Sequence, residues 1–548
     1  MLSERRRVRK AGVRARVPSP GGIVPTRPGG GRGMRDADVV VVGAGIGGLT
    51  TGALLAARGL DVEVFERRSV PGGCCTSLAL DGHRFDVAAS LFYGFGDAGF
   101  NADRRALDEF GASLDVLPKD PSFQFVFEGR RLPVPRSRRA WVEQLCRTFP
   151  SCAGGLRAFY DRLAALYDDV LRIGFLPVAD QSLVELARLA FDRPALVARY
   201  LPLLRHTVWS FLRPLLNDAR PDERRRLRAL LDADLAFGTC ATAAEAPLLL
   251  AVPILIDRHV GGVVYPRGGA QALADTFADA LVHHGGRLHL GVEVRRIAVA
   301  RGRAVGVELA DGRTVRAGHV VSNAGIWNTF QHLLPAPVVS ARTRRHVARL
   351  VPSFSAFISC VSVPAELVPT DFQNHTVVVP DAAAGLSRTT ICYVPSLDDP
   401  SLAPPGRHAV TLVHVAPYEP WAADSGAPAG DRAALDREWT ARALDLAEEL
   451  LPGIAARGRV LATLSPARLE RELGRRYGAV GGPAQVRSQS LHRRPGHRTD
   501  IEALHLVGDS TFPGEGVVAV TLSGIHCADR IAPRRPDAGR TARRGASA

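Results

Sequence analysis

Residues 37–66 read ADVVVVGAGIGGLTTGALLAARGLDVEVFE, and the order of elements predicted by this stretch decides the fold. The apolar run at 37–42 is rich in β-branched side chains, which is typical of a strand buried on both faces. The turn GAGIGG follows, then residues 49–59 with helical spacing, then a second strand that ends at Glu66. This order predicts the start of a Rossmann-type α/β domain.

The glycine turn has the G-x-G-x-x-G spacing of a dinucleotide site. Its first glycine permits the tight turn, its second lets the backbone approach a pyrophosphate, and its third lets the helix pack on the strand. The helix N-terminus offers N–H groups to the phosphates, and Glu66 would accept hydrogen bonds from ribose hydroxyls. The residues expected at the nucleotide are Gly43, Ala44, Gly45, Ile46, Gly47, Gly48 and Glu66. The alternative is a glycine turn that binds no nucleotide.

The next residues, ERRSVPGG at 66–73, indicate which dinucleotide is bound. This glycine pair is similar to the one that wraps the FAD phosphates in flavoproteins of the glutathione-reductase type, which implies FAD rather than NAD. The residues implied beside the cofactor are Arg67, Gly72, Gly73 and Cys74. Cys74 and Cys75 are either a reactive dithiol or two small side chains where bulk does not fit. We favour packing, because this position lies by the phosphates and not by the flavin ring.

The stretch HLVGDSTFPGEGVVAVTLSG at 505–524 predicts a second contact with the cofactor. Its short strand ends at Asp509, where an acid suits a ribityl hydroxyl. A helix begins near Gly516 and continues through Val517 and Val518, and its N-terminus would stabilise negative charge on the flavin. The alternative is a plain core helix.

Glu515, at the entrance of this helix, is the one candidate catalytic residue. It could accept a proton or modify the flavin potential. The alternative is a carboxylate that the helix dipole favours, with no role in the reaction.

The segment 257–330 supplies a third piece of the FAD-binding domain. It predicts a helix from about Ala270 to His284, strands holding Val292 and Val294, and a hairpin that turns at Asp311 and Gly312. Flavoproteins of this type lay the adenine against the backbone of a residue placed like Val294. The domain is therefore expected to be discontinuous, built from residues 36–97, 257–330 and 491–532.

Residues 98–256 and 331–490 carry no nucleotide motif and are expected to form a second, substrate-binding domain. Within them, residues 183–216 mix aliphatic and aromatic side chains with five arginines: Arg188, Arg193, Arg199, Arg205 and Arg213. Such a surface could lie on an anionic bilayer and admit a lipid-soluble substrate. The alternative is a set of ordinary amphipathic helices broken at Pro194, Pro202 and Pro214.

The net charge of +15 belongs mostly to the two ends of the chain. Residues 1–33 hold eight Arg and one Lys against one Glu, and residues 533–548 hold five Arg against one Asp. Both tails, 1–35 and 533–548, are poor in aliphatic residues and are expected to be disordered. Met34 stands just before the first strand, so a misassigned start codon would explain the leader. The remainder is close to neutral, so we expect no nucleic-acid partner.

The eight cysteines show no paired spacing apart from Cys74 and Cys75, so we expect neither a disulfide framework nor a metal site. Such cysteine usage suits a reducing cytoplasm. No run reaches the roughly 18 apolar residues of a spanning helix. The protein is therefore expected to be cytoplasmic, with a possible peripheral association with the inner face of the cell membrane.

From residue 37 to 532 the chain resembles the flavoprotein group of phytoene desaturases, carotenoid (prolycopene) isomerases and retinol saturases. The resemblance rests on GHRFDVAASLFYGFGD (82–97), DRHVGGVVYPRGGAQAL (257–273), VVSNAGIWNTF (320–330), SLDDPSLAPPG (396–406) and VGDSTFPGEGVVAV (507–520). It implies a FAD-dependent oxidoreductase with an apolar polyene substrate, and carotenoid desaturation as the leading reaction.

Two departures from the group affect the chemistry. Many relatives have an Arg or small hydroxyl residues where this chain has Cys74 and Cys75, and isomerase-like members usually have an amide in the slot of Glu515. Redox-neutral cis–trans isomerisation with reduced FAD therefore stays an alternative, as do polyene saturation and a non-catalytic flavoprotein. A flavin amine oxidase is less favoured, because no Tyr or Trp follows Tyr477 to flank the flavin ring.

Overall fold

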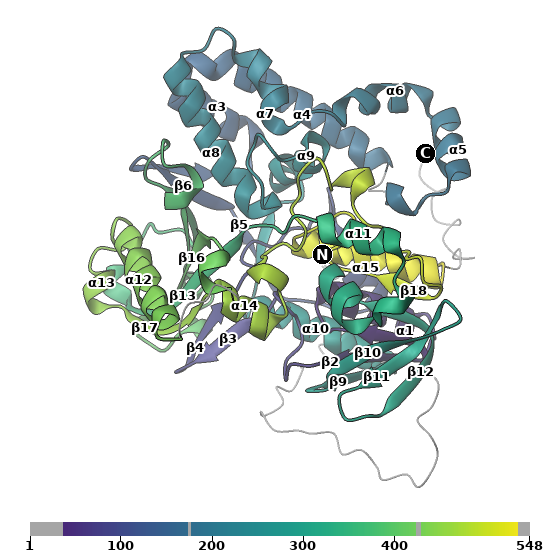
Figure 1. The fold of residues 1–548 in the computed structure, drawn as a ribbon. Helices are drawn as coiled ribbons and strands as arrows, with labels where there is room; N and C mark the ends of the chain where they lie inside the picture. Colours follow the sequence, from purple (N-terminus) through teal and green to yellow (C-terminus); the bar gives the residue numbers. More distant parts are fainter. Residues whose placement is uncertain (1–36, 174–176, 423–428, 535–548) are drawn as a thin grey trace, which may run out of the picture. The chain divides into compact units, whose positions relative to one another are not determined.

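The first sheet is built around the strand at residues 37–42. In the computed structural model, which describes residues 37–173, 177–422 and 429–534, this strand is β1 (Ala37–Val42), and Val39, Val40 and Val41 are fully buried. Five parallel strands follow the order β18–β12–β1–β2–β9 (Figure 1). The other four are β2 (Val62–Glu66), β9 (Arg287–Leu290), β12 (Thr314–Ser322) and β18 (Leu504–Leu506). The predicted Rossmann-type sheet is present.

The start of β12 pairs antiparallel with β11 (Arg303–Leu309), and β11 pairs antiparallel with β10 (Val294–Ala300). The hairpin predicted at Asp311 and Gly312 joins β11 to β12. Val292 lies between β9 and β10, so its assignment to a strand was wrong. The physical reason is Gly291, whose φ of +71° turns the chain after β9.

Four helices share one apolar core with the parallel sheet: α1 (Ile46–Ala57), α2 (Ala102–Phe110), α10 (Ala270–His283) and α15 (Val517–Ile531). Helix α2 falls in the segment 98–256 that was assigned to the second domain. It packs against α1 and α15 because Ala102, Ala106 and Phe110 form its buried face. The boundary expected at residue 97 is therefore too early.

The second sheet has seven strands in the order β17–β13–β16–β15–β14–β6–β7, of which only β14 and β6 pair in parallel. These are β6 (Phe123–Phe127), β7 (Arg130–Val134), β13 (Ser355–Pro364), β14 (His375–Val379), β15 (Thr390–Tyr393), β16 (Arg407–Ala416) and β17 (Arg459–Leu464). Its side chains alternate between two cores. Val378 and Leu412 face α12 (Ala429–Glu448), whereas Val377 and Val413 face the helices of the opposite side.

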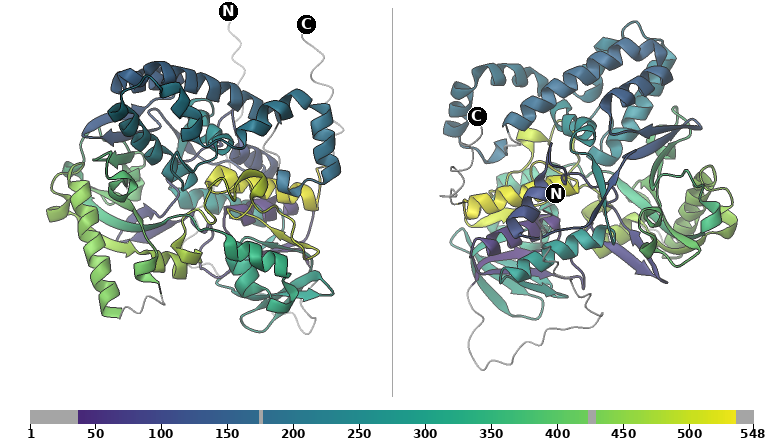
Figure 2. Two further views of the ribbon diagram at one scale, coloured as in Figure 1. Left: turned by 45° about the horizontal axis from the view of Figure 1, so that its top comes forward. Right: turned by 180° about the vertical axis from the view of Figure 1, so that it is seen from behind.

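Those helices lie together above the second sheet in Figure 1, and Figure 2 shows them from two further sides. They are α3 (Arg138–Thr148), α4 (Ala153–Ile173), α7 (Val208–Leu212), α8 (Pro221–Thr239) and α9 (Leu248–Ile256). Next to them, α5 (Leu183–Asp192) and α6 (Pro194–Leu203) form a helical pair. The remaining elements are β3 (Ser77–Leu80), β4 (His83–Asp86), β5 (Val116–Lys119), β8 (Val263–Pro266), α11 (Ala341–Arg349), α13 (Ile454–Arg457) and α14 (Pro466–Leu473).

No helix within the described ranges has the length and hydropathy needed to cross a membrane. The tails predicted to be disordered lie outside the described residues, apart from residues 533 and 534.

Candidate functional site

The glycine turn after β1 and the loop after β2 are tied together by backbone hydrogen bonds. Gly43 has a φ of +95°, and a Cβ at Gly48 would overlap the Gly43 carbonyl, so helix and strand approach as closely as the motif requires. Ala44 N donates to Glu66 Oε2 at 2.9 Å, and Gly72 N donates to Ala44 O at 2.8 Å. These hydrogen bonds hold the two loops side by side.

One cavity of about 850 Å³ runs past these loops. Of the predicted cofactor residues, it is lined by Gly43, Gly45, Ile46, Gly47, Glu66, Arg67, Gly72, Gly73, Cys74, Val294, Asp509, Gly516, Val517 and Val518. Ala44 and Gly48 do not line it, because Ala44 links the turn to Glu66 and Gly48 packs against β1 behind the turn. Pieces 43–48, 66–74, 294 and 509–518 of the chain are therefore brought to one cavity.

Asn323, at the end of β12, is a residue of this cavity that the sequence analysis did not single out as a site residue. Its amide Nδ2 lies 3.4 Å from the Gly43 carbonyl. Cβ atoms built at Gly45 and Gly47 would lie 2.6 and 3.2 Å from its side-chain amide. The glycines therefore leave room for Asn323 as well as for a ligand. A polar residue directly after a buried strand was the available signal.

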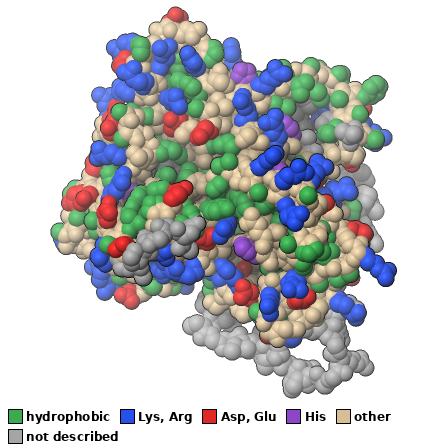
Figure 3. Space-filling model, in the orientation of Figure 1, with side chains coloured by type: hydrophobic (Ala, Val, Ile, Leu, Met, Phe, Trp, Pro, Cys, Tyr) green, Lys and Arg blue, Asp and Glu red, His purple; other side chains and the backbone are tan. Residues whose placement is uncertain are grey.

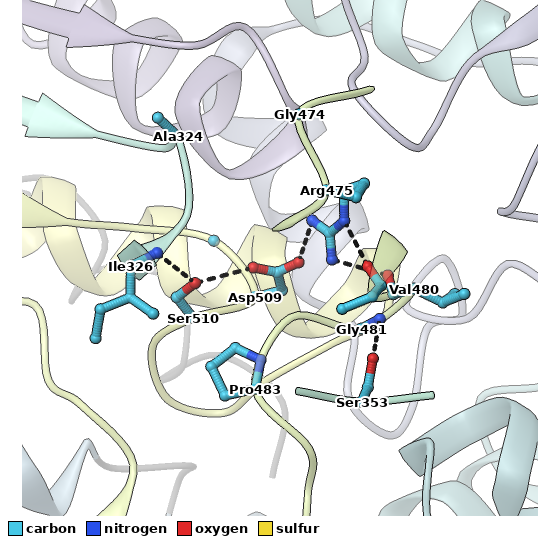
Figure 4. A network of polar contacts seen from close by, with 12 residues as sticks. Ala324, Ile326, Ser353, Gly474, Arg475, Val480, Gly481, Pro483, Asp509 and Ser510 are labelled. Atoms are coloured by element: carbon cyan, nitrogen blue, oxygen red, sulfur yellow. Dashed lines mark hydrogen bonds and ion pairs between the residues drawn. The ribbon is translucent and has the colours of Figure 1, made fainter. Parts of the chain in front are cut away.

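Asp509 forms an ion pair with a residue that the sequence did not single out, Arg475. Arg475 Nη1 forms an ion pair with Asp509 Oδ2 at 2.5 Å, and its remaining donors reach Ala479 O at 2.8 Å and Val480 O at 2.9 Å (Figure 4). Both partners of this ion pair line the cavity. Arg494, which is 1% exposed, donates to the backbone carbonyl of Asp509. The half-buried Arg475 therefore pairs with the carboxylate expected at the ribityl chain, and the buried Arg494 holds the backbone of the same residue.

Glu515 lines the same cavity, and its carboxyl lies against Gly481, which has no side chain. A Cβ at Gly481 would overlap Glu515 Oε2, so only glycine fits there. Glu515 Oε1 is buried without a hydrogen-bond partner among the described residues. Burial raises the pKa of Glu515 to about 7, although the thiol of Cys240 and the charge of Arg494 oppose the shift. The carboxyl can thus exist in both protonation states near neutral pH.

The paired cysteines have the properties of packed side chains. Cys75 is 4% exposed, and its Sγ lies 3.5 Å from the carbonyl of Ala270. Burial raises the pKa of both the Cys74 and the Cys75 thiol, which disfavours the reactive thiolate. Both are free thiols. These observations agree with packing rather than with a redox dithiol.

Beyond the loops, the cavity continues beneath the second sheet as an apolar chamber. Its walls come from alternate residues of four strands and from α9: Ile358, Val377, Ile391, Val413, Leu250 and Ile254. The opposite face of the sheet packs on α12. In the space-filling view, hydrophobic side chains gather over β13 and β16 (Figure 3). A single cavity thus joins polar loops to a chamber suited to an apolar ligand.

The polar end of the cavity fits a flavin dinucleotide. Gly45 begins α1 with no side-chain cap, so the N–H groups of the first helical turn remain available to phosphate. Carboxylates at the ends of the β2 strand and the β18 region suit ribose and ribityl hydroxyls, and Gly43, Gly47, Gly72 and Gly73 keep the wall free of side chains. The fold and the site define a FAD-dependent oxidoreductase of the Rossmann type.

The chain belongs to the flavin-containing amine oxidoreductase family, whose model matches residues 46–532. It is 30% identical over 517 residues to the chloroplastic prolycopene isomerase of Arabidopsis thaliana, covering 92% of this chain and 84% of that protein. It is 27% identical over 538 residues to a neurosporene-forming phytoene desaturase of Cereibacter sphaeroides, covering 93% and 96% of the two chains.

Solved structures show the same fold. An oxidoreductase from Methanosarcina mazei superposes with a TM-score of 0.60 at 20% identity, covering 89% of this chain and 99% of that one. A putrescine oxidase bound to putrescine superposes with a TM-score of 0.60 at 16% identity, covering 91% and 100%.

Proposed function

We propose that this FAD-dependent oxidoreductase acts on an apolar polyene of the carotenoid class. The observation that carries the proposal is the single cavity, in which the flavin-binding loops open directly into the apolar chamber. A polyene has few polar handles, so its affinity must come from apolar burial, at about 25 cal/mol per Å². Relatives named for prolycopene isomerisation and phytoene desaturation support this substrate class.

For the reaction we propose desaturation. Bound FAD supplies a hydride acceptor. Removal of a hydride from an allylic carbon leaves a proton to be taken from its neighbour, and Glu515 is the buried carboxylate of this cavity whose pKa lies near neutrality. Its unpartnered Oε1 is available to accept that proton. Asn323 and the glycine loops would hold the cofactor, and the chamber would orient the chain of the substrate.

Cis–trans isomerisation is the second candidate, and the 30% identity to a prolycopene isomerase favours it. In this reaction the substrate and product have the same mass, and the flavin must be reduced before turnover begins. Glu515 would then influence the flavin and would not have to accept a proton permanently.

Reconstituted holoprotein offered phytoene, neurosporene or prolycopene in liposomes tests these alternatives. Desaturation yields a product that has lost two hydrogens per new double bond and leaves reduced flavin behind. Isomerisation yields a product of unchanged mass, only after pre-reduction. Inertness toward every polyene, with full FAD occupancy, would contradict the proposed substrate class.

We also propose that the protein works in the cytoplasm, peripherally bound to the inner face of the membrane through α5 and α6. Their side chains Val184, Phe191 and Leu201 are 72%, 86% and 62% exposed. Arg188 and Arg193 on the same pair are exposed. Basic side chains also gather over α11 on the face in Figure 3. Apolar side chains flanked by arginines suit an anionic bilayer surface.

Co-sedimentation with phosphatidylglycerol vesicles tests this attachment. Val184→Ser with Phe191→Ser should lower vesicle binding at least about tenfold, because an apolar side chain contributes about 1.5–3 kcal/mol when it leaves water. The matched control is Val282→Ser on α10, where the valine is 55% exposed. Equal binding by the double variant and the control would contradict the proposed surface.

A further inference from the structure

The apolar chamber contains a polar niche, formed by Ser90, Tyr93, Arg258, His375 and Tyr393. All five residues line the cavity. They come from the segment after β4, from the turn after α9, and from β14 and β15. These polar side chains would add no affinity for a ligand that is only a hydrocarbon.

Ring contacts show that most of these residues form one continuous group. His375 stacks on Tyr393 with centroids 5.0 Å apart and meets the edge of Phe123 at 5.7 Å. The guanidinium of Arg258 lies 5.4 Å from the centroid of the same phenylalanine. Tyr93 lines the same cavity three residues after Ser90, whose hydroxyl pairs with His375.

Two polar atoms of the niche have no hydrogen-bond partner in the part of the chain that the structure describes. His375 Nδ1 pairs with Ser90 Oγ at 3.2 Å, but its Nε2 is unpaired. The hydroxyl of Tyr93, a partly exposed residue that lines the cavity, makes no hydrogen bond to a described residue either. His375 is only 5% exposed. Both residues line the cavity, so a ligand that forms hydrogen bonds with these atoms gains affinity over one that leaves them without a partner.

The positive charge of Arg258 in the niche is compensated by a carboxylate. Arg258 donates to both oxygens of Asp234 at 2.8 and 2.6 Å, and these two side chains are almost fully buried. The neighbouring Asp257 accepts hydrogen bonds from the Tyr167 hydroxyl and the backbone of Phe100. Burial lowers the pKa of His375 to about 3, so its imidazole is neutral. Among the five residues of the niche, no cation is left uncompensated, which disfavours a carboxylate or phosphate group as the ligand.

We infer that the polar niche binds an uncharged oxygen substituent, a hydroxyl or a carbonyl, on the polyene, so that this protein takes oxygenated polyenes in preference to hydrocarbons. The inference rests on the proposed function and narrows its substrate class. Tyr93 can donate to such an oxygen, and His375 Nε2 can donate to it or accept from it. A site built to pair with a substrate oxygen discriminates strongly against an analogue that lacks it.

The test compares two polyenes of equal length, one a hydrocarbon and one with a terminal hydroxyl or ketone, bound to the FAD-loaded protein. Dissociation constants come from the shift in polyene absorption, which requires no turnover. The wild type should bind the oxygenated ligand at least tenfold more tightly. In Tyr93→Phe, which removes only one oxygen atom, this preference should fall at least fivefold, and Ser90→Ala with Tyr93→Phe should bring it close to one.

Tyr160→Phe is the matched control. Tyr160 is also buried and feels the charge of Arg258, but it does not line the cavity, and its hydroxyl accepts from Trp141 Nε1 at 2.9 Å. The Tyr160→Phe variant should prefer the oxygenated ligand over the hydrocarbon as strongly as the wild type does. Equal affinity of the wild type for both ligands would overturn the inference, and so would a preference that survives loss of the Tyr93 hydroxyl. Failure to bind either polyene would instead overturn the proposed function.

Discussion

At the scale of single residues, the protonation of Glu515 is set by where the fold buries it. The pKa of about 7 means that the carboxyl is partly protonated at neutral pH, and only the ionised form can accept a proton. The rate of a single desaturation turnover should therefore rise as the pH passes through about 7 and level off above it. Glu515→Gln should lower the rate by about 10²–10⁴-fold and abolish the inflection. Stopped-flow flavin absorbance measures both.

Asp103 provides the control for this prediction. Burial also raises the pKa of its carboxyl to about 7, but Asp103 lies on α2, accepts a hydrogen bond from Thr521 of α15 and does not line the cavity. Asp103→Asn should retain the inflection. An inflection that persists in Glu515→Gln and disappears in Asp103→Asn would remove Glu515 from the reaction.

A second prediction at this scale concerns Cys74. Because burial disfavours its thiolate, Cys74→Ser should keep full FAD occupancy and most of the turnover, whereas Cys74→Leu should lose FAD because it adds bulk beside the glycine pair. Flavin absorbance of the purified variants measures occupancy. Abolished turnover in a Cys74→Ser protein that still holds its flavin would indicate dithiol chemistry instead.

At the scale of elements, close packing of α1 on β1 depends on Gly48. A Cβ there would overlap a backbone carbonyl, which cannot move aside, so Gly48→Ala should destabilise the fold by about 1–3 kcal/mol and lower FAD affinity. Gly154 in α4 has nothing within 4 Å of a built Cβ. Gly154→Ala should therefore be neutral or stabilise by up to about 1 kcal/mol. Urea denaturation compares the two, and equal losses would refute the packing argument.

A buried chain of hydrogen bonds joins the turn before α5, which holds Asp180, to α15 and to Gly508 after β18. His497 donates from N and Nδ1 to Asp180 Oδ2, at 2.9 and 2.5 Å, and its Nε2 lies 3.2 Å from Ser523 Oγ, which accepts from Gly508 N. Burial alone would raise the pKa of Asp180, but the hydrogen bonds from His497 lower it to about 2. The stability contributed by this pair is therefore present above about pH 4 and is lost as the pH falls towards 2.

His497→Ala should cost about 3–5 kcal/mol, because it leaves the Asp180 carboxylate buried without its side-chain partner. His492, exposed in the same loop, supplies the comparison, and His492→Ala should change stability by less than about 0.5 kcal/mol. Chemical denaturation at pH 7 gives both values. If His497→Ala lowers the free energy of unfolding no more than His492→Ala does, the hydrogen bonds of His497 do not stabilise the fold.

At the scale of the whole molecule, the described residues between 37 and 534 form one compact unit in which both sheets line a single cavity. FAD should therefore stabilise the two sheets together. At a free concentration of one hundred times Kd, it should raise the free energy of unfolding by about 2.7 kcal/mol. Thermal unfolding followed by tryptophan fluorescence and by circular dichroism should shift by the same amount. A transition that does not respond to FAD would contradict this coupling.

The sequence alone determined the part of the FAD-binding domain that is built from neighbouring residues in the chain. The strand at 37–42, its glycine turn and the acid at 66 act over a few residues, and their backbone preferences are written in composition and spacing. The sequence predicted the ends of strands less well, as at Gly291. It also did not predict which core α2 joins, because that depends on the shape of the helix face that packs.

Only the tertiary structure decided the contacts that determine the chemistry of the site. Arg475 meets Asp509, Gly481 makes room for Glu515, and the niche at His375 gathers residues from segments hundreds of positions apart. Such contacts depend on the register of strands and the packing of helices, which no local pattern encodes. Spacing specifies how a short segment folds, and the fold alone specifies which distant side chains share a buried space.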